Sequence, residues 1–279
     1  SFLPKLPLRE WVETFVKFLT KHLSEFFDAV SGAMESMADG LVWLLSIGGI
    51  PGASYILIIL ITLIAWRAAG MKTGLFALIG LGLIHNLGYW PQTVDTLALI
   101  VMSVVISVLI GIPIGIWMSQ KDAARSFITP ILDFMQTMPA FVYLIPAVLF
   151  FGIGMVPGII ATIVFAMPPT VRLTNLGIRQ VDPELIEASD AFGSTTGQKL
   201  VKVQIPLAMP SMMAGINQTI MLSLSMVVTA SLVGAPGLGE LVYRAITQVR
   251  IGLGFESGLA LVIIAILLDR ITQGAKRKR

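Results

Sequence analysis

Long apolar stretches without charged residues recur through most of this chain, and they limit its fold more than any other feature. A helix needs about 20 such residues to cross the roughly 30 Å of hydrocarbon in a bilayer. With 56% hydrophobic residues, 13% charged residues and a mean hydropathy of +0.87, the chain lies outside the range of an ordinary soluble domain. We therefore predict an all-α polytopic membrane protein with about seven spans, at residues 50–66, 73–90, 94–119, 127–151, 155–171, 205–234 and 253–271.

The distribution of lysine and arginine predicts how these spans are oriented. Positively charged loops stay on the cytoplasmic side of a membrane. If the C-terminus is cytoplasmic, most of the 19 basic residues fall on that side, so we expect the N-terminus outside. The basic tail at 274–279 then acts as a cytoplasmic anchor or contacts anionic lipids. Lipid-facing loops also account for the net charge of +3, and we do not expect nucleic-acid binding.

Two residue types needed for common metal and redox sites are scarce or missing. The chain has no cysteine, which excludes disulfides, thiolate metal ligands and cysteine nucleophiles. Its two histidines, His22 and His85, are too few for a histidine-rich site. We therefore expect no metal centre.

An amphipathic pattern at residues 8–30 sets the start of the chain apart. Aromatic and aliphatic residues, including Trp11, Phe15 and Phe18, recur at three- and four-residue intervals, with charged residues opposite them. Such a helix lies in the membrane interface, docks on the bundle as a scaffold, or simply packs against another helix. We assign 1–49 to this segment and 50–90 to two peripheral spans.

The long polar stretch that precedes the sixth predicted span is the least expected part of the chain. Loops of this length in a compact protein are usually functional. Asp182-Pro183-Glu184 reads as a helix start, and Gly193 as the end of that helix. A second short helix follows the cap Ser194-Thr195-Thr196 and runs towards Ile205-Pro206. A pair of short helices on the cytoplasmic side is suited to being held by another protein.

The residues of this stretch resemble the EAA loop of binding-protein-dependent ABC importer permeases. The matching positions are Glu187, Ala188, Ser189, Gly193, Val203, Ile205 and Pro206, with Ser189 where the family usually has alanine. The resemblance implies a type I importer transmembrane domain over 91–273. It also implies a coupling loop, at 172–206, that inserts into a cleft of an ATPase subunit. An ordinary interhelical loop is the alternative.

Three further segments look like the glycine betaine/proline betaine branch of that family. They are DFMQTMPAFVYLIP at 133–146, FAMPPTVR at 165–172 and GAPGLG at 234–239. The resemblance implies import of a compatible solute across a bacterial plasma membrane. Choline, carnitine, methionine or an oxyanion remain alternative substrates, and a secondary transporter or a structural scaffold are alternative functions.

The resemblance also implies partners for this chain. They are a second copy of the permease, two cytoplasmic ATPase subunits and an external binding protein or lipoprotein. The sequence contains no Gly-x-x-x-x-Gly-Lys-Ser/Thr phosphate loop. We therefore expect the partner ATPase to bind ATP and Mg²⁺, and this chain to be no enzyme and to hold no cofactor.

A betaine carries a quaternary ammonium, which binds aromatic faces, and a carboxylate, which requires hydrogen-bond donors. Polar groups within a span are costly unless they face a partner or a cavity. Asp133, the one acid of its span, either pairs or caps there or contacts substrate. Residues that line the pathway, or alternatively pack between helices, are predicted to be Met135, Gln136, Met138, Phe141, Tyr143, Asn217, Gln218 and Met221.

Overall fold

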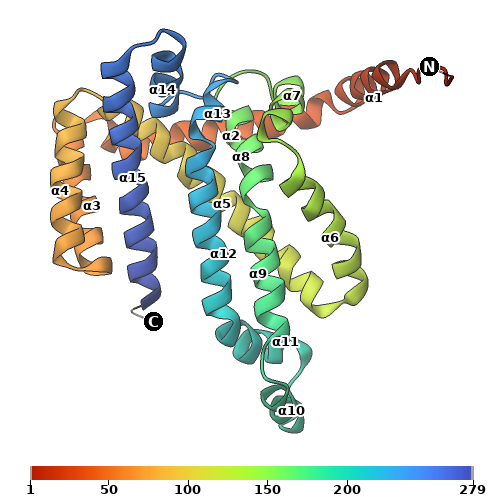
Figure 1. Cartoon of the computed structure of the whole chain (residues 1–279). Helices are drawn as coiled ribbons and strands as arrows, with labels where there is room; N and C mark the ends of the chain where they lie inside the picture. Colours follow the sequence, from red (N-terminus) through yellow and green to blue (C-terminus); the bar gives the residue numbers. More distant parts are fainter. Residues whose placement is uncertain (1, 278–279) are drawn as a thin grey trace.

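The computed structural model describes residues 2–277, and over that range the chain is helical and contains no strand (Figure 1). The all-α prediction is confirmed. The helices are α1 Leu8–His22, α2 Ser24–Leu45, η1 Ile47–Gly49, α3 Ala53–Ala69, α4 Met71–Asn86, α5 Trp90–Gln120, α6 Asp122–Thr137, α7 Ala140–Phe151, α8 Met155–Ala166, α9 Pro168–Arg179, α10 Pro183–Ala191, α11 Thr196–Lys199, η2 Leu200–Gln204, α12 Ile205–Ser225, α13 Val227–Ser231, α14 Leu238–Thr247 and α15 Ile251–Arg277.

Each predicted span corresponds to helical structure, but the helices differ in length. Three continuous helical runs in the described residues are long and apolar enough to cross a membrane: Trp90–Gln120, Met155–Arg179 and Ile251–Ala275. The pair α6 and α7 makes a fourth if it counts as one span, and α3 is a shorter apolar helix. The predicted fifth span ended at 171, which is wrong, because the helix continues through α9 to Arg179.

The predicted span at 127–151 corresponds to two helices, because the helix breaks in its middle. Helices α6 and α7 meet at an angle of 103°. Met138 and Pro139 have extended backbone at the break. The ring of a proline disfavours the helical conformation in the residue before it, so Met138 cannot continue α6.

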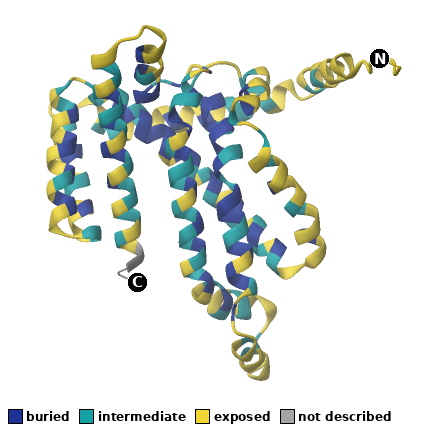
Figure 2. Cartoon of the chain, in the orientation of Figure 1, coloured by how far each residue is buried: buried dark blue, intermediate teal, exposed yellow. Residues whose placement is uncertain are grey.

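The amphipathic N-terminal segment forms two helices instead of the single helix expected at 8–30, and they meet at Leu23. Helix α1 has no buried residue and projects away from the bundle (Figures 1 and 2). Helix α2 packs across α5, α7 and α8. The ring of Phe27 in α2 stacks on Phe150, with centroids 4.6 Å apart. Of the two helices, α2 therefore docks on the bundle and α1 does not.

Close contact between α5, α9 and α12 forms the centre of the bundle (Figure 1). Gly111 and Gly115 of α5 lie against α9, and Gly215 of α12 lies against Pro169 and Leu173 of α9. A Cβ atom added at Gly115 or Gly215 would lie within 3 Å of the backbone of α9. Glycine therefore allows these three helices to approach more closely than side chains would permit.

The hairpin of α3 and α4 lies at the side of this centre and packs on α15. Gly80 of α4 faces Ile263 of α15, and Gly274 of α15 lies against the backbone of Ala68. The basic tail that we expected at the lipid surface, Lys276–Arg279, lies outside the residues whose side chains are described.

We expect Gly115→Val to destabilise the bundle, because its Cβ would lie 2.7 Å from both Cβ of Thr174 and the carbonyl oxygen of Val171. Overpacking of this kind costs about 1–3 kcal/mol. Thermal unfolding of the purified protein in detergent measures the effect. The matched control is Gly82→Val in α4, where no atom lies within 4 Å of the added Cβ. Equal melting temperatures for the two variants would contradict the role given to Gly115.

Candidate functional site

A compact helical element connects α9 to α12 at the end of the bundle opposite α1 (Figure 1). It consists of α10, α11 and the π-helical turn η2, which leads directly into α12. Within the predicted coupling stretch 172–206, residues 172–179 belong to α9 and Ile205 and Pro206 begin α12. We call residues 180–204 the connecting element.

Local capping explains where α10 begins and ends. The side chain of Asp182 accepts a hydrogen bond from the backbone N–H of Glu184 at 3.0 Å, and Pro183 occupies the first helical position. Gly193 follows the helix with a φ of +77°, which lies in the left-handed region. Its N–H donates to the carbonyl of Asp190 at 3.0 Å. Both ends of α10 therefore lie where the sequence predicted them.

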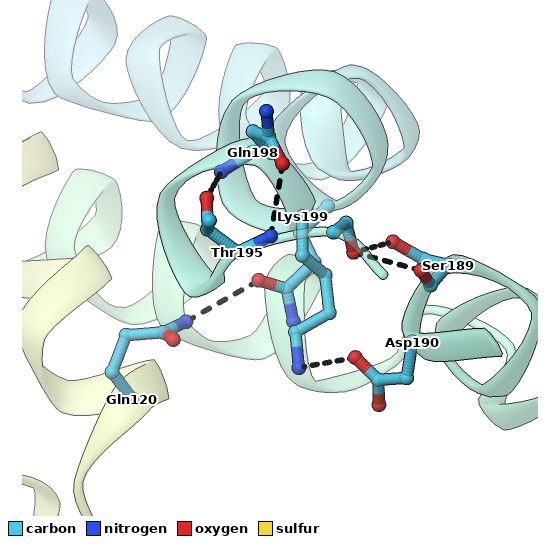
Figure 3. A network of polar contacts seen from close by, with 8 residues as sticks. Gln120, Ser189, Asp190, Thr195, Gln198 and Lys199 are labelled. Carbon is cyan, nitrogen blue, oxygen red and sulfur yellow. Dashed lines mark hydrogen bonds and ion pairs between the residues drawn. The ribbon is translucent and has the colours of Figure 1, made fainter. Parts of the chain in front are cut away.

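Side-chain contacts hold α10 and α11 together (Figure 3). Thr195 and Gln198 form a capping box at the start of α11, with reciprocal side-chain to backbone bonds of 3.1 and 2.9 Å. The hydroxyl groups of Ser189 and Ser194 lie 2.6 Å apart. Ser189, where the family usually has alanine, thus contributes a bond that an alanine could not form. An ion pair of 3.3 Å between Lys199 and Asp190 spans the same turn.

The outer surface of the connecting element is open. Helix α10 has no buried residue, and the side chain of Phe192 is 92% exposed. Glu187 is also exposed. A hollow opens between α10 and the turn η2, lined by Leu185, Ala188, Ser189, Phe192, Gly193, Ser194, Gln198, Lys202 and Val203. Four of the seven residues singled out in the sequence therefore line one hollow. Glu187 directly precedes one of them in α10, and Ile205 and Pro206 begin α12.

The inner side of the connecting element meets the bundle through Gln204, and Arg179 fixes the end of α9, from which the element continues. Arg179 forms an ion pair of 2.9 Å with Asp122 and donates to the carbonyl of Met118 at 2.6 Å. The buried Gln204 faces Gln120 at the end of α5, at 3.5 Å. The sequence did not identify these contacts, because residues about 60 and 80 positions apart form them and no local pattern relates them.

The residues predicted to line a pathway do not form one surface within a single chain. Phe141 and Gln218 are exposed, and Met138, Asn217 and Met221 are half-buried. Met135 packs beside an apolar cluster that includes Met118 and Val171. Tyr143 is only 3% exposed, and its buried hydroxyl has no hydrogen-bond partner among the described residues. Their role as pathway residues stays a prediction.

Gln136 belongs to a polar cluster that also contains Asp133 and Arg172. Arg172 donates from Nη2 to Oδ1 of Asp133 at 2.6 Å and from Nε to Oε1 of Gln136 at 2.8 Å. Arg172, which we expected in a cytoplasmic stretch after the fifth span, lies within the helix α9. The signal available in the sequence was the helical spacing of its neighbours, since Val171, Thr174, Asn175 and Ile178 are all buried on one side of α9.

The chain matches a known family and several characterised permeases. Residues 107–276 match the family described as binding-protein-dependent transport system inner membrane component. The glycine betaine transport system permease protein OpuAB of Bacillus subtilis (strain 168) is 53% identical over 99% of this chain and 97% of its own length. The glycine betaine/carnitine transport permease protein GbuB of Listeria monocytogenes serotype 1/2a (strain 10403S) is 50% identical, over 99% and 98%.

Two further proteins are similar to this chain. The glycine betaine/proline betaine transport system permease protein ProW of Escherichia coli (strain K12) is 46% identical over 98% of this chain and 76% of its own length. A solved structure of the MetNI methionine ABC transporter in an inward-facing conformation has a TM-score of 0.61 at 23% identity. It covers 68% of this chain and 94% of the other. That likeness establishes a shared fold.

We expect Gly193→Val to loosen the connecting element, because a β-branched residue strongly disfavours the φ of +77° at this position. Strain of this kind costs about 1–3 kcal/mol. Hydrogen exchange of residues 180–204 should become faster, while exchange in α5 and α9 stays unchanged. Gly197→Val within α11 is the control, since its φ is not in the left-handed region and no atom lies within 4 Å of the added Cβ. Unchanged exchange in the Gly193 variant would contradict this assignment.

Proposed function

Because the chain belongs to the binding-protein-dependent transport system inner membrane component family, we propose that it forms the membrane pathway of an ATP-driven importer for glycine betaine and related compatible solutes. The observation that carries the proposal is the 53% identity to a glycine betaine permease over almost the full length of both chains. Three relatives with 46–53% identity all have glycine betaine in their names. This supports a betaine over methionine or an oxyanion.

A second candidate substrate is carnitine. One of the three relatives is named for both glycine betaine and carnitine. Carnitine, like glycine betaine, carries a quaternary ammonium and a carboxylate on one small molecule, so one pathway can accept both. A secondary transporter receives no such support, since nothing in that mechanism requires the connecting element.

We expect the ATPase subunits to bind the connecting element and to move this chain through it. Its outer face is open, with an exposed aromatic residue beside a hollow, whereas its inner side meets α5 through Gln204 and continues directly from α9. A partner ATPase that moves α10 therefore pulls directly on these two helices. In this proposal ATP and Mg²⁺ bind only to two ATPase subunits, and this chain performs no chemistry.

The remaining partners follow from the same proposal. Two copies of the chain line one pathway, and an external binding protein or lipoprotein delivers the solute. The N-terminus lies outside and the C-terminus lies in the cytoplasm of a bacterial plasma membrane, with anionic lipids near the basic tail. Helix α1 and the connecting element lie at opposite ends of the bundle, which supports this orientation (Figure 1).

We expect ATP-dependent uptake of radiolabelled glycine betaine into liposomes that hold this chain, its ATPase and its binding protein. Glu187→Arg should abolish uptake and the co-purification of the ATPase, because it reverses an exposed charge beside the proposed docking hollow. The fold of the variant should be unchanged, since the exposed side chain of Glu187 has no hydrogen bond or ion pair within residues 2–277 and surface substitutions change stability by only about 0.5 kcal/mol.

Glu25→Arg provides the control, because it reverses the charge of an exposed glutamate on α2, far from the connecting element. This variant should transport like the wild type. Uptake and assembly that survive Glu187→Arg would refute the docking surface. Intact assembly without uptake of glycine betaine would refute the proposed substrate.

A further inference from the structure

The cluster of Arg172, Asp133 and Gln136 places two opposite charges within the membrane-spanning part of the bundle. Asp133 lies about 16 Å along α6 from Asp122, and Arg172 lies about 10 Å along α9 from Arg179, at 1.5 Å per residue. Asp122 and Arg179 pair with each other at the end of the bundle that carries the connecting element. Asp133 and Arg172 therefore lie within apolar helical runs long enough to cross a membrane, away from the end of the bundle that carries the connecting element.

Charged residues at this depth are costly to the fold, and they usually face a water-filled cavity or a functional partner. The chain's own packing does not cover this pair. The side chain of Asp133 is 62% exposed and that of Arg172 is 33% exposed. Within the described residues, the second guanidinium nitrogen of Arg172, Nη1, has no partner, and neither does Oδ2 of Asp133.

We propose that Arg172, Asp133 and Gln136 form a binding site for zwitterionic solutes in the translocation pathway, an inference that rests on the proposed function. The guanidinium of Arg172 offers its N–H groups to a carboxylate, in the planar arrangement that suits bidentate pairing. The carboxylate of Asp133 attracts a quaternary ammonium. Gln136, released from Arg172, supplies a neutral amide donor to the solute carboxylate.

The pairing of opposite charges selects for a zwitterion. A solute with only a positive charge satisfies Asp133 and leaves Arg172 unpaired, and a simple anion does the reverse. Leaving one charge without a partner after the solute has displaced its water is unfavourable. A zwitterion replaces both partners at once, so the ion pair opens without leaving either charge unpaired.

The surrounding helices are arranged so that the site can open. Helix α6 contacts α9 over few residues, among them Leu132, which packs with Met118 of α5 and Val171 of α9, and Figure 1 shows it leaning away from α12. Gln136 is one residue from the end of α6, next to the 103° break at Met138 and Pro139. A tilt of α6 at this break would separate Asp133 from Arg172 and leave the glycine contacts of α9 in place, while opening the apolar contact of Leu132 with Met118 and Val171.

The test replaces the ion pair by an apolar contact, Asp133→Leu with Arg172→Met, in the complete transporter with its ATPase and binding protein. Replacement of an ion pair by apolar residues of similar size is often neutral or stabilising. We expect normal assembly, melting temperature and stimulation of ATP hydrolysis by the binding protein. Uptake of glycine betaine per ATP hydrolysed should fall by about tenfold or more, because both charged contacts to the solute are removed.

Asp269→Asn is the matched control. Asp269 also accepts from a glutamine, Gln273, on a spanning helix, but it lies on the peripheral α15. This variant should keep the wild-type uptake per ATP. If the apolar pair does not assemble, Arg172→Lys with Asp133→Glu decides the question, since it keeps an ion pair between α6 and α9 and removes the planar guanidinium. Its uptake per ATP should also fall.

The outcomes separate this proposal from the proposed function. If the variant with the apolar pair keeps the wild-type uptake per ATP, the zwitterion site is overturned and the ion pair only connects two helices. The same conclusion follows from the Lys–Glu variant if it is the one that assembles. Absence of glycine betaine uptake in the wild-type assembly counts against the proposed function itself. Uptake by the wild type and its loss in an assembled variant support both.

Discussion

The close approach of α5, α9 and α12 is the contact on which the rest of the structure depends. Glycines on α5 and α12 let both helices lie against the backbone of α9, so α9 is held from two sides. The same helix carries Arg172 on one face and ends in Arg179, which binds α5 and Asp122. Because α9 is packed closely on two sides, we expect a movement of the connecting element to reach the bundle through this helix.

The connecting element combines an open outer face with a fixed inner face. Its short helices have little buried surface and owe their shape to caps, to the left-handed Gly193 and to the contacts among Ser189, Ser194 and Lys199. Such an element keeps its form without a hydrophobic core of its own. It therefore presents a defined surface to a partner, while Arg179 and Gln204 determine which helices respond.

Much of this arrangement could be predicted from the sequence, and the failures have common physical causes. Hydropathy located the helices, and the caps at Asp182, Thr195 and Gly193 are local signals that act within a few residues. The break at Pro139 was missed because an apolar run has the same composition whether it is straight or bent. Arg172 was placed in a loop because a charge was taken as the end of a span. Its true surroundings depend on Asp133, 39 positions away.

The π-helical turn at Leu200–Gln204 has a consequence for how this chain changes over evolution. A π-turn accommodates one extra residue in an otherwise α-helical path, and a single residue rotates everything that follows by about 100° about the helix axis. The faces of α11 and α12 are therefore out of phase with each other. If a deletion removed the extra residue of the π-turn, every helix would remain, but the partner-binding surface would be rotated relative to α12. We therefore expect insertions and deletions at this turn to be far rarer than substitutions.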